Sequence, residues 1–165
     1  MTYSVELRDL EPEDLDLIHQ IENDPQLWPW SEDARPYSRY AIRQYLAEQP
    51  GDIFRDRQLR LAIVADGEAV GVADLTDFSP RHLRAEVGIV VLRSHHRKGI
   101  ATQALQKLAQ YAHDRLHLRS LSAFVASDNL PAQGLFRQLG YHEVGSLKRW
   151  IEGQTDALLF QLVME

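Results

Sequence analysis

Hydrophobic and polar positions along the first third of the chain change period, and each period predicts an element. Residues 3–8 alternate apolar and polar side chains, as a half-buried strand does. From Pro12 the apolar spacing becomes helical, with three residues on one face: Leu15, Ile18 and Ile21. A second short helix is expected to begin with Ser38 as its N-cap and to end at Pro50-Gly51, with Ile42, Tyr45 and Leu46 inward. The stretch between them, Asp24 to Tyr37, is expected to be irregular.

The middle of the chain has the alternation and turn signals of a meander. A strand from Leu59 to Val64 leads into Asp66-Gly67, a strong hairpin-turn pair, and a return strand runs from Ala69 to about Thr76. A third extended run, from Glu86 to Leu92, is almost continuously apolar. Such a run favours a strand that is covered on both faces.

The last third alternates helical and extended patterns. A helix follows residue 99, with a buried stripe of six residues: Ile100, Ala104, Leu105, Leu108, Ala109 and Ala112. Next come a strand (120–127), a short helix (129–139) that ends at Gly140, and two strands that flank the Glu152-Gly153 turn. This order predicts an α+β fold with a mostly antiparallel sheet. No linker or repeat divides the chain, so residues 1–165 are expected to form a single domain.

Composition narrows the class of protein. The chain has 165 residues, 44% of them hydrophobic and 25% charged, which is typical of a soluble globular domain. It has no cysteine, which excludes disulfides, thiolate metal sites and a cysteine nucleophile. The N-terminus lacks the features of a signal peptide, and no apolar run approaches the ~18 residues that span a bilayer. We therefore expect a cytoplasmic protein with no membrane partner.

The net charge of −6 also bears on partners. Nucleic-acid binding needs a basic face that neutralises phosphates, so an acidic chain argues against it. The same charge is compatible with a cationic ligand, although net charge mainly affects solubility.

The segment after Leu92 carries the clearest chemistry. A buried strand ends, a basic loop containing Gly99 follows, and a helix starts. N–H groups at a helix start lack partners and lie at the positive end of the helix dipole, and glycine lets the backbone approach an anion. Arg97 and Lys98 add positive charge, so the expected ligand carries a di- or polyphosphate. G-x-x-x-x-G-K-[ST] and G-x-G-x-x-G are both absent, which argues against a P-loop or dinucleotide site. Taken alone, such a loop is more often a solvated helix start that binds only water.

Two motifs together resemble one family. The segment from His96 to Ala101, HRKGIA, resembles the pyrophosphate loop [QR]-x-x-G-x-[GA] of the GNAT acetyltransferase superfamily. The segment from Val125 to Tyr141 resembles its second signature, in which an Asn ends a strand and a short helix ends in an aromatic residue followed by Gly-[FY]. The resemblance covers roughly residues 59–163. It implies a mixed, mostly antiparallel sheet with splayed central strands flanked by helices.

The resemblance also implies an activity, the transfer of an acetyl group from acetyl-CoA, as co-substrate, to an amine. In this family the pantetheine arm would pair with the backbone of Ile89, Val90 and Val91. The pyrophosphate would be held by the loop residues His96, Arg97, Lys98, Gly99, Ile100, Ala101 and Thr102. Asn129 would hydrogen-bond the pantetheine arm, and Phe136 would pack beside the thioester.

Acyl transfer to an amine needs a base and an oxyanion donor. Glu86 is the candidate base, because the family often has an acidic residue facing the cleft there and burial would raise its pKa. The alternative for Glu86 is a surface carboxylate paired with Arg84. The backbone N–H of Val91 is the candidate oxyanion donor.

Two residues depart from the family pattern. Phe136 stands where many members have a tyrosine that is proposed to protonate the leaving thiolate, so that proton is expected to come through water or Tyr141. His96 replaces the usual Arg or Gln. We expect no metal site, because His95 and His96 have no third ligand at a recognisable spacing.

The identity of the acetyl acceptor is the least determined part of the predicted activity. The chain most resembles the branch that holds spermidine/diamine and ribosomal-protein N-terminal acetyltransferases, on the strength of the segment from Ala85 to Gly88 and the hairpin from Gly145 to Asp156. We expect a small polyamine-type amine, with a protein N-terminus as the alternative. A non-catalytic CoA-binding regulator and a purely structural interaction domain are further alternatives, and a homo-oligomer stays open. Acidic residues could attract a cation (Glu22, Asp24, Glu32 and Asp33), and Trp28 and Trp30 could form core or pocket wall.

Overall fold

The computed structural model describes residues 2–30 and 35–165, and one seven-stranded sheet runs through them. The strands lie in the order β1-β2-β3-β4-β5-β7-β6. Their bounds are β1 (Val5–Asp9), β2 (Leu59–Ala65), β3 (Glu68–Ser79), β4 (Arg84–Val91), β5 (Ser120–Ala126), β6 (His142–Ile151) and β7 (Thr155–Val163). All neighbours are antiparallel except β4 and β5, which are parallel. The predicted α+β fold with a mostly antiparallel sheet is confirmed.

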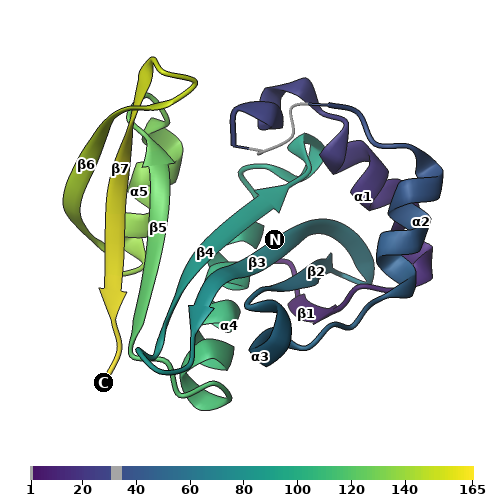
Figure 1. Ribbon diagram of the computed structural model, residues 1–165, viewed down its shortest axis with the longest axis horizontal. Coiled ribbons are helices and arrows are strands. Elements are labelled where there is room, and N and C mark those ends of the chain that lie inside the picture. Colours follow the sequence, from purple (N-terminus) through teal and green to yellow (C-terminus); the bar gives the residue numbers. More distant parts are fainter. Residues whose placement is uncertain (1, 31–34) are drawn as a thin grey trace.

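The parallel pair in the middle of the sheet separates soon after it forms. β4 and β5 pair only from Arg84 to Glu86 on one strand and from Ser120 to Ser122 on the other. Beyond these three pairs the strands diverge and leave the V visible in Figure 1. The splayed central strands implied by the family resemblance are therefore present.

Helices cover both faces of the sheet (Figure 1). α4 (Ile100–Asp114) and α5 (Leu130–Gln138) contribute to the larger core cluster, which includes Ile63 and Ala73. α1 (Leu15–Glu22) and α2 (Arg39–Ala47) pack on the opposite face, over Ala62 and Val72. Successive strand residues point to opposite faces, which is why neighbouring residues join different clusters. The short helices are η1 (Pro12–Asp14), η2 (Pro25–Trp30), α3 (Ile53–Asp56) and η3 (Arg93–His95).

β4 is covered on both sides, as its apolar run predicted. Ile89 and Val91 pack against the cluster beneath α4, whereas Val90 and the following Leu92 pack against the cluster beneath α1 and α2. Their side chains stay only partly buried, because one edge of the strand has lost its neighbour.

The predicted N-cap at Ser38 forms, and Asn129 provides a second N-cap that was not predicted. The Ser38 hydroxyl accepts a hydrogen bond from the Ala41 N–H at 3.0 Å, and the Asn129 side chain accepts one from the Ala132 N–H at 3.1 Å. Each cap satisfies an N–H group that the helix leaves without a partner.

Some boundaries differ from the prediction. β3 continues to Ser79, β4 begins at Arg84, and α3 was not expected. Its N-cap is Asp52, whose carboxylate accepts from the Phe54 N–H at 2.9 Å. The expected irregular segment contains η2, while the interpretations of the Trp28 and Trp30 side chains lie outside the described part of the molecule.

Candidate active site

The turn between β4 and α4 presents backbone N–H groups at the start of a helix. Arg97 and Gly99 both have left-handed backbone conformations, with φ of 62° and 74°. The first intrahelical hydrogen bond of α4 runs from the Gln103 N–H to the Gly99 carbonyl at 3.2 Å. The N–H groups of residues 100–102 therefore have no acceptor within the helix, which is the arrangement that binds phosphate.

The same loop is anchored at both ends. Ile100 is fully buried in the core, and Ala101 and Thr102 are half-buried, whereas residues 96–99 are exposed. The Gln103 side chain donates to the Tyr3 carbonyl at 2.9 Å, and the Lys98 ammonium lies 5.6 Å from the centroid of the Tyr3 ring. The basic side chains are thus held near the free N–H groups without being buried.

His96 connects this loop to the end of β4. Its Nε2 lies 2.6 Å from the Val91 carbonyl oxygen. Because a carbonyl oxygen only accepts, the imidazole nitrogen is the donor. The carbonyl of a residue at the open edge of β4 is therefore occupied by a side chain of the loop.

Along the open edge of β4, the backbone N–H and C=O groups of successive residues point alternately toward β3 and into the V. Val91 lies opposite Gly71, and the next N–H, from Leu92, donates to the Val70 carbonyl at 2.9 Å. In an antiparallel ladder, this hydrogen bond lies beside a residue pair, here Val91 and Gly71, whose members make no backbone hydrogen bonds to each other. The N–H and C=O of Val91 therefore point away from β3, into the V. Ile89, two residues earlier, has the same orientation. Val90 points its backbone groups at β3, which narrows the expected pantetheine contacts to Ile89 and Val91.

Glu86 stands where the two central strands part. It is the last β4 residue that pairs with β5, opposite Ser122. The Thr76 hydroxyl donates to Glu86 Oε2 at 3.1 Å, and within the described residues Glu86 makes no ion pair with Arg84. Burial raises the pKa of the Glu86 carboxyl above its ordinary value, the nearby charge of Asp77 adds to this, and the Thr76 hydrogen bond opposes it.

The other arm of the V is built by β5 and the start of α5. Asn129 is exposed, and its carbonyl oxygen is used in capping α5, which leaves its NH2 group for other partners. Gln133 is buried and donates to the carbonyls of Ala126 and Ser127, at 3.2 and 3.0 Å. These bonds fix how the chain leaves β5.

Phe136 is buried at the foot of this arm. Its ring makes an edge contact with Tyr141, at 5.0 Å between centroids, and stacks on Phe160 at 6.2 Å. The Tyr141 hydroxyl is itself buried and has no hydrogen-bond partner within residues 2–30 and 35–165. Since water has no contact with that oxygen, a ligand in the V cannot reach it in this conformation. Tyr141 is therefore a poor candidate for proton delivery, contrary to one of the two routes we had considered.

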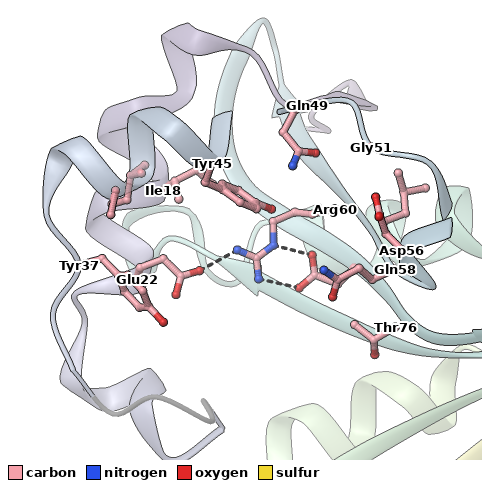
Figure 2. Close-up of a pocket in the computed structure, with 14 residues that line it drawn as sticks. Ile18, Glu22, Tyr37, Tyr45, Gln49, Gly51, Asp56, Gln58, Arg60 and Thr76 are labelled. Carbon is pink, nitrogen blue, oxygen red and sulfur yellow. Dashed lines mark hydrogen bonds and ion pairs between the residues drawn. The ribbon is translucent and has the colours of Figure 1, made fainter. Parts of the chain in front are cut away.

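A cavity of about 350 Å³ lies between α1, α2 and the sheet. Figure 2 shows that polar side chains from different elements converge on it, with Tyr45 above and Arg60 at the centre. Among the described residues that line it are three carboxylates (Glu22, Asp56 and Asp74) and one arginine, Arg60. Thr76 also lines the cavity, and its hydroxyl is the one bonded to Glu86. Glu86 does not itself line the cavity, and Thr76 connects the two through this hydrogen bond.

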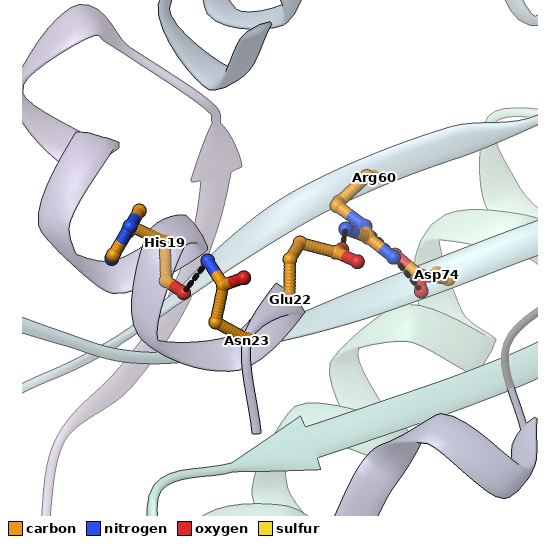
Figure 3. Close-up of polar contacts among 5 residues, drawn as sticks. All are labelled: His19, Glu22, Asn23, Arg60 and Asp74. Atoms are coloured by element: carbon orange, nitrogen blue, oxygen red, sulfur yellow. Dashed lines mark hydrogen bonds and ion pairs between the residues drawn. The ribbon is translucent and has the colours of Figure 1, made fainter. Parts of the chain in front are cut away.

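Arg60 is held by two carboxylates (Figure 3). Its Nε and Nη2 donate to the two oxygens of Asp74 at 2.8 and 3.1 Å, and its Nη1 donates to Glu22 at 2.7 Å. Burial would lower the pKa of Arg60, but the charge and hydrogen bonds of Asp74, together with Glu22, raise it above the ordinary value. The guanidinium is a permanent positive charge in the cavity floor.

The acidic residues expected to attract a cation have different surroundings. Glu22 lines the cavity, but Asp24 pairs with Arg93 at 3.2 Å and accepts from the Gln26 N–H at 3.0 Å. Glu32 and Asp33 lie outside the described residues. Within residues 2–30 and 35–165 no group of three His, Cys, Asp or Glu side chains is arranged to hold a metal ion. None of the described helices is long and apolar enough to span a membrane.

Comparison with known proteins agrees with this geometry. The family described as "Acetyltransferase (GNAT) domain" matches residues 4–142. Spermidine N(1)-acetyltransferase of Escherichia coli K12 is 32% identical, over 92% of this chain and 81% of that protein. The chain belongs to the GNAT acetyltransferase family. It is an acetyl-CoA-dependent N-acetyltransferase, as its two motifs predicted.

Two further GNAT proteins bear on the fold and on the acceptor. A crystal structure of spermidine N-acetyltransferase from Vibrio cholerae, in complex with CoA and spermine, superimposes with a TM-score of 0.84 over 96% of this chain and 95% of that one, at 24% identity. A putative ribosomal N-acetyltransferase, YdaF of Bacillus subtilis, is 25% identical over 98% of this chain and 91% of that protein. The whole described sheet thus has the GNAT arrangement.

Several residues of the site were not expected from the sequence. Arg60 is the only polar residue of β2, and that contrast was the available signal. Asp74 and Thr76 lie among other polar residues of β3, so the sequence did not single them out. Asn23 was also missed: its side chain bonds the N–H and the carbonyl of Tyr37, at 2.8 and 3.2 Å, and also donates to the His19 carbonyl at 2.9 Å. Asn23 thereby fixes the end of α1 against the loop that leads into α2, and its bond to His19 is drawn in Figure 3.

Proposed function

We propose that this enzyme acetylates a primary amine of a small, polyamine-type acceptor that binds in the cavity between α1, α2 and the sheet. The observation that carries the proposal is the charge of that cavity, which has three carboxylates against one arginine and is lined by Thr76, the hydrogen-bond partner of Glu86. A cationic amine is attracted to such a cavity and directed toward a base. The name of the E. coli relative, spermidine N(1)-acetyltransferase, supports the same acceptor class. The proposal treats residues 1–165 as a single catalytic domain.

The acetyl donor would lie in the V on the other side of Glu86. We assign its pyrophosphate to the loop from His96 to Thr102, whose free N–H groups and basic side chains suit an anion. Its pantetheine arm would run along the open edge of β4, against Ile89 and Val91, with the Asn129 NH2 group on the opposite arm. Phe136 would close the apolar end of the V beside the thioester.

In the proposed reaction the acceptor enters as an ammonium ion. Glu86 removes its proton, directly or through a water molecule, because only the neutral amine has a lone pair for attack. The amine nitrogen then forms a bond to the thioester carbonyl carbon, and the carbonyl oxygen becomes negatively charged. The Val91 N–H, which points into the V, donates to that oxygen.

The attacking nitrogen loses its second proton to water, and collapse of this intermediate breaks the carbon–sulfur bond and releases the acetylated amine and the CoA thiolate. The thiolate takes a proton from water, since Phe136 has none to give and the Tyr141 hydroxyl is out of reach. A thiol pKa of about 8.5 makes the thiolate a sufficient leaving group near neutral pH. The proton taken up by Glu86 returns to solvent.

An acceptor panel tests the proposal. Release of free thiol from acetyl-CoA is followed with diamines, polyamines, and peptides that carry a free N-terminus, with a reaction lacking acceptor as the control. We expect the highest kcat/KM with a di- or polyamine. Turnover only with peptides would favour the activity named for YdaF, and tight CoA binding with no turnover would favour a regulator.

The assembly and the cellular location were also expected from the sequence. A homo-oligomer and a cytoplasmic location stay predictions. So does the expectation that neither nucleic acid nor a membrane is a partner.

A further inference from the structure

The acidic cavity has a positive charge of its own, and its position is fixed by folding. Arg60 on β2 lies directly opposite Asp74 on β3, so the two side chains meet on the same face of the sheet. Glu22, the last residue of α1, reaches the same guanidinium from the helix layer. Three hydrogen bonds of 2.7 to 3.1 Å hold it in the cavity floor (Figures 2 and 3).

The positive charge of Arg60 is permanent, and solvent screens it only in part. An arginine stays protonated at every pH at which proteins fold. The side chains of Arg60 and Glu22 are each 26% exposed and that of Asp74 is 18% exposed, so solvent screens their charges less than at an open surface. Asp56, the third carboxylate of the cavity, lies nearer the exterior and accepts from the exposed Arg55 at 2.8 Å. Much of the negative charge of the cavity is therefore already matched by arginine.

We infer that Arg60 is a specificity-determining residue, a built-in counter-ion that limits how many positive charges a bound acceptor can carry. The inference rests on the proposed acceptor class and refines it. One ammonium group of the acceptor approaches Glu86, and each further ammonium group must share Glu22 and Asp74 with a guanidinium that is already bound to both. The enzyme should therefore gain little from a third or fourth amine.

The test compares acceptors that share a reacting end and differ in charge: 1-aminobutane, 1,4-diaminobutane and spermidine. For the native enzyme we expect kcat/KM to change by less than about threefold from the diamine to the triamine. In Arg60→Gln the two carboxylates lose their counter-ion, and the triamine should gain about fivefold or more over the diamine, the range expected for partly exposed ion pairs. Arg60→Lys keeps the charge and should keep the native preference.

Arg39→Gln is the matched control. Arg39 pairs with Asp16 at 2.6 Å at the exposed start of α2, and it does not line the cavity. Arg39→Gln removes one positive charge, as Arg60→Gln does, but from a position outside the cavity. It should leave the acceptor preference unchanged. A preference that shifts equally in Arg39→Gln and Arg60→Gln would reflect the overall charge of the protein and would overturn the inference.

A second variant covers the case in which Arg60→Gln does not fold. Glu22→Gln keeps the shape of the side chain and removes one carboxylate, so the triamine should lose ground to the diamine by a similar factor. An unchanged preference in folded Glu22→Gln, or in folded Arg60→Gln, contradicts the inference. Binding of the three amines to the CoA-bound protein by calorimetry gives a separate readout: if no amine is acetylated, the proposed function fails, while tighter triamine binding by Arg60→Gln still supports the role of Arg60.

Discussion

Glu86 and Asp74 lie on the same face of adjoining strands, yet their surroundings give them different chemistry. Asp74 uses both oxygens to bind Arg60, so its charge is committed to an internal ion pair. Glu86 has only the Thr76 hydroxyl as a hydrogen-bond partner among the described residues, and burial raises its pKa. Two carboxylates whose surroundings differ in this way take different chemical roles. Glu86 is suited to proton transfer, and Asp74 is suited to holding the cavity floor.

Replacing Glu86 by glutamine tests this assignment. Glu86→Gln keeps the shape and removes the base, so kcat should fall by about 10²- to 10⁴-fold while acetyl-CoA affinity stays similar. In the native enzyme the active form is the carboxylate, and its pKa is raised. Activity should therefore decline as the pH falls, with a midpoint above the ordinary glutamate pKa of about 4.3. Native turnover together with a native pH–rate profile in the variant would exclude Glu86 as the base.

The aromatic pair behind the V raises a second residue-level question. Phe136 lacks the hydroxyl that many relatives carry there, and the nearby Tyr141 hydroxyl is buried without a partner. A buried hydroxyl that makes no hydrogen bond costs about 1–3 kcal/mol. Burial also raises the pKa of Tyr141, which keeps the group protonated and uncharged. Both rings are packing groups in the fold, and in the proposed reaction the leaving thiolate would take its proton from water.

Two substitutions at position 136 test this view. In Phe136→Tyr turnover should change only a fewfold, because the thiolate already leaves without a dedicated acid. In Phe136→Ala acetyl-CoA should bind more weakly and turnover should drop further, because the cavity left beside Tyr141 and Phe160 loosens the wall of the V. Both quantities are measured with the best acceptor. A large gain in Phe136→Tyr would mean that the native enzyme lacks an acid it could have used, and no loss in Phe136→Ala would remove Phe136 from the donor site.

At the scale of single elements, local chemistry was sufficient where a helix begins or a hairpin turns. Ser38 caps the helix it was expected to cap, and Asp66-Gly67 forms the turn between β2 and β3. Side-chain oxygens at helix starts and positive φ in tight turns depend on a few neighbouring residues, so sequence alone predicts them. The four-residue α3 has too little periodicity to be predicted in this way.

The cavity floor could not be predicted, because it depends on one irregular residue. At the turn Ala65 pairs with Glu68, and a regular ladder would place Arg60 opposite Ala73. The register shifts by one residue near Ile63 and Val64, where β3 has an extra residue, and Arg60 comes to lie opposite Asp74. Gly71 stands at this shift, and a Cβ there would lie 2.2 Å from the Val90 carbonyl oxygen. A bulge of this kind has no reliable sequence signal, and the ion pair at the centre of the site follows from it.

The loop before α4 allows a prediction with a matched control. Gly99 has φ of 74° with open space around its Cα, so valine is opposed by the backbone conformation and would project into the space assigned to the pyrophosphate. Acetyl-CoA affinity should fall at least tenfold in Gly99→Val, as measured by calorimetry. Gly153→Val imposes similar strain, at φ of 70°, in the exposed turn between β6 and β7, and should keep native affinity. Equal affinities for a folded Gly99→Val variant and the native protein would place the pyrophosphate elsewhere.

At the scale of the whole molecule, the sheet consists of two parts with few bonds between them. β1 to β4 form one part and β5 to β7 the other, and three residue pairs join them. They are also joined by the core cluster shared by α4, α5 and both parts of the sheet, and by the N–H groups of Arg119 and Ser120, which donate to the Leu83 carbonyl at 2.8 and 3.2 Å. The proposed donor site has residues from each part, with the loop and β4 on one side and Asn129 and Phe136 on the other. Acetyl-CoA in the V would therefore supply contacts that the missing strand pairs do not.

This arrangement predicts that acetyl-CoA stabilises the fold as a whole. A ligand that binds only the folded state at 100 times its Kd adds about 2.7 kcal/mol, which for a chain of this length corresponds to a rise in Tm of roughly 5–10 °C. Pantetheine lacks the pyrophosphate and should give a much smaller rise at the same concentration. Hydrogen exchange should slow at both arms of the V, at residues 89–92 and 123–129, because the ligand holds them together. A full rise in Tm with protection at only one arm would show that acetyl-CoA binds one part of the sheet and does not bridge the V.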